Sequence, residues 1–430
     1  MKGVNGFLFT AWFSCCLLFF TQTGKAQLQT DNCPTTKDDH LWYGLLSLNN
    51  AAVLSFEFRI IQSPGSAGAD VWAIEIYNAD EVIHVNEVSV TSDSLFFKMP
   101  VFDSEFRCRR MSADSLSGIW INHARKDNNV IQFAAWNEKV IPVEKCLCST
   151  FSGKWEVEFN PGTPDAYKAI GLLKDPHCAD LIYGTFLTET GDYRFLSGYT
   201  FVNGSDSMFT LRCFDGSHAY VFRARKSRDG TLEGDFFSGA QGHEKWLAKR
   251  NEKFELRNED SLTFLKPGFK KFDFSFPDLL GKQVSLSDSK FKNKVVIVQI
   301  MGSWCPNCMD ETRFLSGFYE QNMLRGLEII GLAYEKTGEM SKAVANVERL
   351  KKRFNCTYPV LIAATSNDRV AAAETLPALN QIMSYPTTLF IDKKGKVRKI
   401  TTGFSGPATG LYYDKYVEGI NAFVDKLLRE

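Results

Sequence analysis

The stretch from Val295 to Glu311 constrains the fold of this chain more than any other. It begins with the apolar, largely β-branched run Val-Val-Ile-Val-Gln-Ile, which predicts a buried strand. Gly302 and Ser303 break that pattern, and the segment Trp304-Cys-Pro-Asn-Cys308 follows, where a helix is expected to begin. A strand that delivers two cysteines to the first turn of a helix limits both the surrounding fold and the available chemistry.

Cys305 is predicted to be the attacking thiol. It lies near the cap of the expected helix, where unpaired backbone N–H groups and the positive end of the helix dipole stabilise a thiolate. Pro306, at the first helical position, needs no partner for its nitrogen. Cys308 lies inside the helix and is shielded, which suits a thiol that resolves a mixed disulfide. The pair Cys305–Cys308 is therefore predicted to form a redox-active disulfide.

Two other interpretations of this cysteine pair are weaker. Zinc requires two further ligands, yet no histidine follows His243, and Cys356 is the one other cysteine in the last third of the sequence. A purely structural bridge across so short a loop would remove little entropy from the unfolded chain. The sequence therefore predicts no metal site and no cofactor.

The N-terminus is typical of a secretory signal over residues 1–26. The apolar run Phe7–Phe20 is too short for a comfortable membrane span, and cleavage is expected after Ala26. Cys15 and Cys16 are interpreted as apolar filler, because the run continues past them. No later run reaches the roughly 18 apolar residues of a span. We expect an exported protein of the bacterial periplasm or cell envelope, without an integral membrane segment after signal removal.

Charge and cysteine content narrow the possible partners. Lys plus Arg and Asp plus Glu both number 50, so no charge excess indicates a nucleic-acid or anionic-membrane partner. Of the 11 cysteines, removing the two in the signal leaves nine in an oxidising setting. Six of them precede the last third and allow roughly 15 pairings, among which the sequence does not choose: Cys33, Cys108, Cys146, Cys148, Cys178 and Cys213.

The region from about residue 41 to 256 has the pattern of an all-β structure. Short alternating runs such as Val53–Ile60 and Trp72–Tyr77 are separated by turn signals such as Pro64-Gly65 and Asn203-Gly204. Helical periodicity is scarce. This pattern predicts antiparallel sandwich or barrel architecture.

An internal duplication divides this β region. Four segments recur in the same order, which predicts two similar β modules, residues 27–150 and 151–257, followed by a charged linker over 258–270. The matched pairs are Asp93–Phe96 with Asp206–Phe209, Phe102–Ser104 with Phe214–Ser217, Leu116–Gly118 with Leu232–Gly234, and Phe133–Lys139 with Leu247–Lys253. No catalytic constellation is found within these modules.

Residues 271–430 show alternating strands and helices, which predicts a mostly parallel sheet with an antiparallel edge. The expected strands are Val295–Ile300, Leu327–Ala333, Tyr358–Ile362 and a hairpin of Thr387–Ile391 with Val397–Thr401. The expected helices are Pro306–Leu324, Met340–Phe354, Ala371–Ile382 and Tyr413–Leu427.

The cysteine motif and Tyr385-Pro386-Thr387 together resemble a thioredoxin-fold domain. More closely, the region from about residue 270 to 430 resembles the TlpA/ResA-like extracytoplasmic thiol-disulfide oxidoreductases. The Lys-Gly-Lys turn of the predicted hairpin and the extra helix Met340–Phe354 belong to the same resemblance. No family resemblance covers residues 27–255.

The resemblance implies a role for several residues. Pro386 would be a cis-proline facing the cysteines, and it would line a substrate groove together with Trp304, Pro306 and Tyr385. A cis bond exposes the preceding backbone for pairing with an extended peptide. The alternative from the sequence alone is a trans proline that ends a loop.

Glu311 matches the glutamate of the CxxCxxE motif in these ResA-like proteins. The resemblance implies that it acts in proton transfer near the active site. By helical spacing it lies one turn from Cys308. Its alternative interpretation is an acid that favours the helix dipole. Where thioredoxin itself has a buried acid, this sequence has Gln299, which cannot ionise, so the proton role shifts towards Glu311.

The leading functional hypothesis is an exported oxidoreductase that reduces protein disulfides, with protein clients and an upstream thiol electron donor as partners. The motif does not fix the direction of transfer. A peroxidase of the peroxiredoxin type is a second hypothesis, although its Pro-x-x-x-Thr-x-x-Cys loop is absent before Cys305. A third is a binding protein whose main role lies in the β modules.

Overall fold

The computed structural model describes residues 41–49, 52–65, 70–125, 127–137, 151–175, 180–269, 271–366 and 369–430. The segment His40–Glu430 forms one compact unit. The predicted signal at 1–26 and the cysteines Cys33, Cys146, Cys148 and Cys178 lie outside the described residues, as do the predicted limits at 150 and 270. The predicted limit at 257 stays a prediction.

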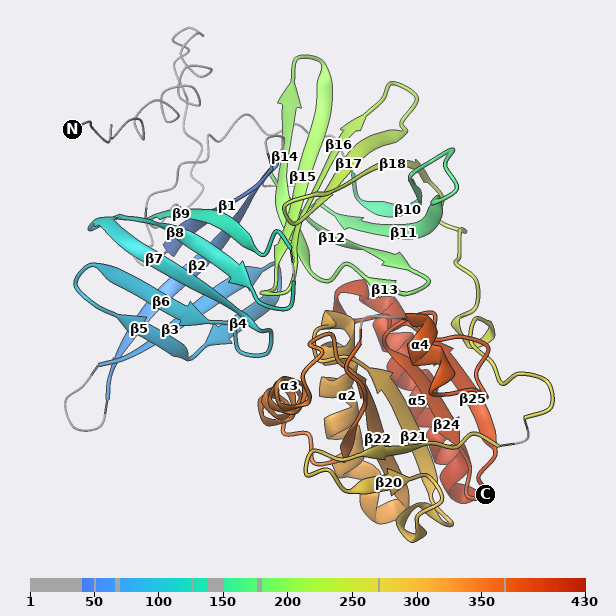
Figure 1. Ribbon diagram of the computed structural model, residues 1–430. Helices are drawn as coiled ribbons and strands as arrows, with labels where there is room; N and C mark the ends of the chain where they lie inside the picture. The colour runs from blue at the N-terminus through green and yellow to red at the C-terminus, as the bar shows by residue number, and fades with distance from the viewer. Residues whose placement is uncertain are drawn as a thin grey trace, which may run out of the picture. The chain divides into compact units, whose positions relative to one another are not determined.

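The first β module is a single antiparallel sheet, drawn blue to cyan in Figure 1, with the strand order β4-β3-β2-β1-β9-β8-β7-β6-β5. Its inward face is built by alternation, as in β2, where Leu54, Phe56 and Phe58 are buried. The strands are β1 (Leu41–Asn49), β2 (Ala52–Pro64), β3 (Asp70–Asn78), β4 (Glu81–Val85), β5 (Glu87–Val90), β6 (Ser94–Lys98), β7 (Ser104–Ser112), β8 (Ser115–Asn122) and β9 (Val130–Trp136).

The second β module is a closed barrel. Its order is β11-β10-β18-β17-β16-β15-β14-β12-β13, and a further ladder between β11 and β12 completes the ring. Aromatic side chains, among them Trp155, Phe186 and Trp246, fill its interior. The strands are β10 (Gly153–Phe159), β11 (Tyr167–Lys174), β12 (Leu181–Thr188), β13 (Gly191–Asp192), β14 (Leu196–Asn203), β15 (Asp206–Phe214), β16 (Ala219–Lys226), β17 (Leu232–Ser238) and β18 (Gly242–Arg250).

The two modules share one topology. Each strand of the first sheet corresponds to the strand nine places later, so that β1 matches β10 and β9 matches β18, and the neighbours are the same throughout. The modules differ in one ladder. In the second module β12 also pairs with β14, which closes the barrel. In the described part of the first module, the equivalent strands β3 and β5 are in contact but form no ladder. The predicted fold class, two similar antiparallel β modules, is confirmed.

A pair of equivalent glycines explains one of the matched sequence segments. Gly118 opposes Cys108 in the first module, and Gly234 opposes Ala224 in the second. A Cβ atom on Gly118 would overlap the carbonyl oxygen of Arg107, and one on Gly234 would overlap that of Arg223. Both strand pairs therefore approach too closely at this point for any side chain.

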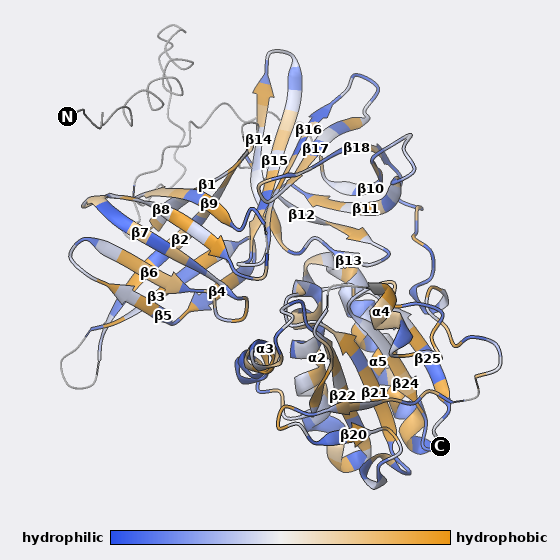
Figure 2. Ribbon diagram, viewed as in Figure 1, coloured by the Kyte–Doolittle hydropathy of each residue, from blue (hydrophilic) through white to orange (hydrophobic). Residues whose placement is uncertain are grey.

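The C-terminal domain is an α/β domain with the sheet order β23-β22-β21-β24-β25. Strands β21 to β23 are parallel, and β24 and β25 form the antiparallel edge. Every residue of β21 is buried, and Figure 2 shows this sheet in the colours of apolar residues. The elements are β19 (Ser275–Pro277), β20 (Gln283–Ser285), β21 (Val295–Met301), α2 (Pro306–Asn322), β22 (Leu327–Tyr334), α3 (Met340–Arg353), β23 (Val360–Ala364), α4 (Arg369–Glu374), β24 (Thr387–Ile391), β25 (Val397–Thr402) and α5 (Leu411–Arg429).

The prediction of a helix over Ala371–Ile382 is wrong beyond Glu374, where α4 ends. Pro377 cannot continue a helix, because it lacks an N–H group and its ring clashes with the preceding turn. Instead, Leu379 forms an isolated bridge with Leu265, which belongs to the predicted linker. Among the helices that the structure describes, none has the length and apolar character needed to cross a membrane.

Replacing either close-approach glycine is expected to destabilise its module. Gly118→Ala and Gly234→Ala should each lower the free energy of unfolding by about 1–3 kcal/mol, because the new methyl group collides with backbone. Chemical denaturation followed by circular dichroism measures this change. Gly317→Ala is the control: Gly317 is exposed in the interior of α2 with open space around its Cβ position, so the substitution should stabilise by about 0.5–1 kcal/mol. Equal effects at all three positions would contradict the packing argument.

Candidate active site

The predicted junction of strand, turn and helix holds the two cysteines. Cys305 is the N-cap of α2, and the backbone N–H of Cys308 donates a hydrogen bond to its sulfur at 3.4 Å. Pro306 occupies the first helical position. Both cysteines are free thiols, and they are buried, with exposed fractions of 6% for Cys305 and 0% for Cys308. The helix start therefore supplies a hydrogen bond directly to the sulfur that is predicted to attack.

A second loop lies beside the first cysteine. The bond between Tyr385 and Pro386 is cis, and the thiol of Cys305 donates to the carbonyl oxygen of Tyr385 at 3.3 Å. The rings of Trp304 and Tyr385 meet edge to face, with 5.5 Å between their centroids. The structure therefore brings together Cys305 and the predicted groove residues Trp304, Tyr385 and Pro386.

Glu311 is fully buried and has three hydrogen-bond donors around its carboxylate. Thr388 of β24 donates at 2.8 Å, Gln299 of β21 at 2.9 Å and Tyr416 of α5 at 3.1 Å. Burial raises the pKa of Glu311 to about 7, although the three hydrogen bonds oppose that rise. An acid with such a pKa both accepts and releases a proton near neutral pH.

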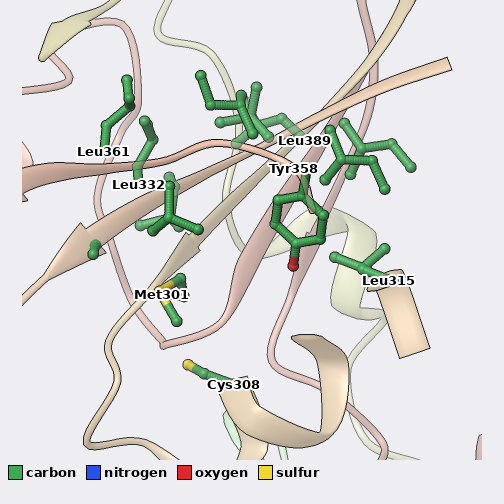
Figure 3. Packing of buried hydrophobic residues seen from close by; sticks show 14 of the residues in the cluster. Met301, Cys308, Leu315, Leu332, Tyr358, Leu361 and Leu389 are labelled. Carbon is green, nitrogen blue, oxygen red and sulfur yellow. The ribbon is translucent and has the colours of Figure 1, made fainter. Parts of the chain in front are cut away.

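Cys308 lies in the apolar core on the first turn of α2, in a cluster that also contains Met301 and Tyr358 (Figure 3). Burial, followed by the neighbouring Cys305 thiol, raises the pKa of Cys308 well above its ordinary value, and the nearby Glu311 carboxylate adds to the rise. The second thiol is therefore held in its protonated form, so any reaction through it needs a proton acceptor.

Comparison with known proteins identifies the domain that carries these residues. The family model described as Redoxin matches residues 266–412. The C-terminal part of the chain is a Redoxin domain. Among curated proteins, the thiol-disulfide oxidoreductase ResA of Geobacillus thermodenitrificans is 33% identical over 131 residues, which cover 30% of this chain and 66% of that protein. ResA of Bacillus subtilis is 31% identical over 131 residues, covering 30% and 64%.

The chain thus spans just under two thirds of the length of these relatives. Among solved structures, a thiol:disulfide interchange protein of the thioredoxin family from Chlorobium tepidum is 25% identical, with a TM-score of 0.26 over 34% of this chain and 94% of that one. The two curated relatives confirm the predicted resemblance to ResA-like proteins over the C-terminal region.

The Redoxin domain also contains site residues that sequence reasoning missed. Glu335 is buried and accepts hydrogen bonds from the backbone N–H and the hydroxyl of Ser303 at 2.8 and 2.6 Å. Lys336 lies over the ring of Trp304, with its Nζ 3.1 Å from the centroid. These contacts fix the loop that leads into Cys305.

Thr388 and Tyr416 of the Redoxin domain were also missed. Thr388 lies two residues after the cis-proline, and this proximity could have marked it as a site residue. Tyr416 belongs to the buried face of the amphipathic helix α5, where the sequence gives no sign that its hydroxyl has a role. Within the described ranges, no cluster of three or more His, Cys, Asp or Glu side chains is placed to hold a metal ion.

The raised pKa of Glu311 predicts a pH-dependent stability of the Redoxin domain. The folded state keeps this proton up to about pH 7, whereas the unfolded chain releases it near the ordinary value of 4.5. The folded state thus binds more protons between these values, so stability falls as the pH rises through that window, by roughly 3 kcal/mol in total.

Glu311→Gln is expected to remove this part of the pH dependence. Denaturant unfolding at pH 4.5 and pH 8 gives the change in unfolding free energy between the two pH values. The readout is how much smaller this change is in Glu311→Gln than in the unaltered protein. A variant with the same pH slope as the unaltered protein would show that Glu311 ionises normally.

Proposed function

We propose that this protein is an exported thiol-disulfide oxidoreductase that reduces disulfides in other proteins. The observation that carries the proposal is the position of Cys305. Its sulfur accepts a hydrogen bond at the start of α2 and lies 3.3 Å from the carbonyl oxygen that precedes the cis-proline. The ResA relatives share this domain, which supports the same chemistry here.

The first step is attack by the Cys305 thiolate on one sulfur of the client disulfide. A bond forms between Cys305 and that sulfur, the client's S–S bond breaks, and the second client sulfur leaves as a thiolate that takes up a proton. The cap N–H and the helix dipole stabilise the attacking thiolate. The backbone of Tyr385, next to Cys305, offers a hydrogen-bonding partner for an extended client segment.

The second step releases the client. Cys308 loses its proton and attacks the sulfur of Cys305, which forms the Cys305–Cys308 disulfide and frees the remaining client thiol. The client gains two electrons and the enzyme loses them. Glu311 is proposed as the acceptor of the Cys308 proton, because it is buried near that thiol and has a pKa of about 7. An upstream thiol donor then returns the enzyme to the dithiol form.

The peroxidase hypothesis gains no support from the residues around Cys305. Ser303 is the hydroxyl closest in sequence, and its side chain donates to Glu335 at 2.6 Å. It is therefore engaged away from the first cysteine, where a peroxidase would need a hydroxyl to polarise the peroxide. Export rests on the predicted signal at residues 1–26, and the envelope location is part of the proposal.

Replacement of Cys308 is expected to trap clients. In Cys308→Ser the first step proceeds and the second cannot, so mixed disulfides with Cys305 accumulate and are detected by non-reducing electrophoresis and mass spectrometry. Cys305→Ser should abolish the reduction of insulin disulfides.

Cys356→Ser is the matched control for these replacements. Cys356 is also a buried free thiol of the Redoxin domain, but it lies outside the motif, so activity should be retained. If Cys308→Ser formed no mixed disulfide while Cys305 remained reactive to alkylation, protein-disulfide reduction would be ruled out.

A further inference from the structure

The second β module contacts the backbone on both sides of Cys305. The hydroxyl of Ser217, in the turn between β15 and β16, donates to the carbonyl oxygen of Trp304 at 3.2 Å. The guanidinium of Arg194, just after β13, donates to the carbonyl oxygen of Pro306 at 3.3 Å. Residues more than eighty positions away in the chain thus bind the neighbours of the attacking thiol.

The turn between β12 and β13 contacts the cis-proline loop and the start of α2. Ser384, two residues before Pro386, donates to the carbonyl oxygen of Thr190 at 2.7 Å. Gly191 faces Asn307, which stands between the two cysteines; a Cβ atom at Gly191 would overlap the Asn307 amide nitrogen. Gly191 also has a φ of +133°, which residues other than glycine rarely adopt, so the turn is closely packed on the motif.

Arg194 is the centre of a buried charge cluster that joins three parts of the chain. It is 3% exposed and forms ion pairs with Glu81 of β4, Asp310 of α2 and, at 3.7 Å, Asp215 of the second module. Burial alone would lower the pKa of Arg194, but the carboxylates of Asp310, Glu81 and Asp215 raise it well above its ordinary value. Removing one member of such a cluster leaves buried charge without a partner, which is strongly destabilising for the contact.

Asp192 adds a second connection from the same turn. One of its carboxylate oxygens accepts from the backbone N–H of Arg194 at 2.6 Å, and the other accepts from the backbone N–H of Gly406 in the Redoxin domain at 2.6 Å. The turn is thus fixed to the Redoxin domain through a buried side chain as well as through Arg194.

We propose that the second β module is a specificity-determining wall of the thiol site and that Arg194 is the positioning residue that fixes it there. This inference rests on the proposed function. With the wall in place, disulfides of small or extended molecules reach Cys305, whereas those on the surface of folded domains are excluded until the wall separates from the Redoxin domain. The β modules then select clients rather than act as spacers.

Two substitutions weaken the wall in different ways. Arg194→Ala removes the central cation, and Gly191→Phe keeps Arg194 but inserts a bulky side chain against Asn307, at a φ of +133° that also strains the turn. Arg212→Ala is the control, because Arg212 is a half-buried arginine of the same module that lies over the ring of Tyr199, 4.9 Å from its centroid, outside the charge cluster. Circular dichroism of each full-length variant checks the fold, and if Arg194→Ala fails to fold, Gly191→Phe decides.

The first readout is access to Cys305 in the reduced protein. Alkylation by iodoacetamide and by a bulky polyethylene glycol maleimide is timed, and the modified cysteine is identified by peptide mass spectrometry. In the unaltered protein and in Arg212→Ala, Cys305 should react far more slowly with the bulky maleimide than with iodoacetamide. Both wall variants should raise the bulky rate by about tenfold or more, with little change for iodoacetamide. Equal bulky rates in all four proteins would overturn the proposal.

The second readout is turnover. For each protein, the rate of insulin reduction is divided by the rate of reduction of oxidised glutathione. This ratio should be higher in the wall variants than in the unaltered protein. If the rates for insulin and for oxidised glutathione fell together in the wall variants, the proposal that the wall excludes folded clients would be wrong. Because alkylation requires no disulfide exchange, it tests the wall even if the proposed oxidoreductase function fails.

Discussion

The antiparallel pairing of β21 with β24 is the interaction on which the thiol site depends. Ile300, the last residue but one of β21, is opposite Thr387, at the start of β24. The chain leaves the first strand towards Cys305 and enters the second strand directly from Pro386. One ladder therefore sets the distance between the cysteine motif and the cis-proline loop, and Thr388 in the same ladder binds Glu311. Because both strands are fully buried, this spacing is held by packing as well as by hydrogen bonds.

The arrangement of the site residues was predictable from the sequence to the extent that it is local. Cys305, Pro306, Cys308 and Glu311 lie within one strand–turn–helix unit, whose periodicity and turn residues are visible in the chain. Thr388 and Tyr416 were not predictable in this way, because their contacts with Glu311 depend on how a distant strand and the last helix pack. The expected helix Ala371–Ile382 shows the opposite case, since it ends at Glu374 although its local breaker, Pro377, was visible in the sequence.

The β modules show the same division. The repeated segments predicted a duplication, and the equivalent glycines at 118 and 234 give a physical reason for one of the matches, because neither position tolerates a Cβ atom. Closure of the second sheet into a barrel was left open between sandwich and barrel. Arg194 carried no sequence signal at all: a single arginine in a turn predicts solvent exposure, and its burial depends on three carboxylates that are far apart in the chain.

The position of Tyr416 has a consequence for the order in which the protein matures. It lies in α5, the last helix of the described chain, and it supplies one of the donors to Glu311. A chain that folds from its N-terminus completes the hydrogen bonds around Glu311 only when this helix docks. Until then Glu311 lacks one of its three donors, so in the proposed mechanism the step that impaired folding would slow is resolution by Cys308, and mixed disulfides formed by Cys305 would persist longer.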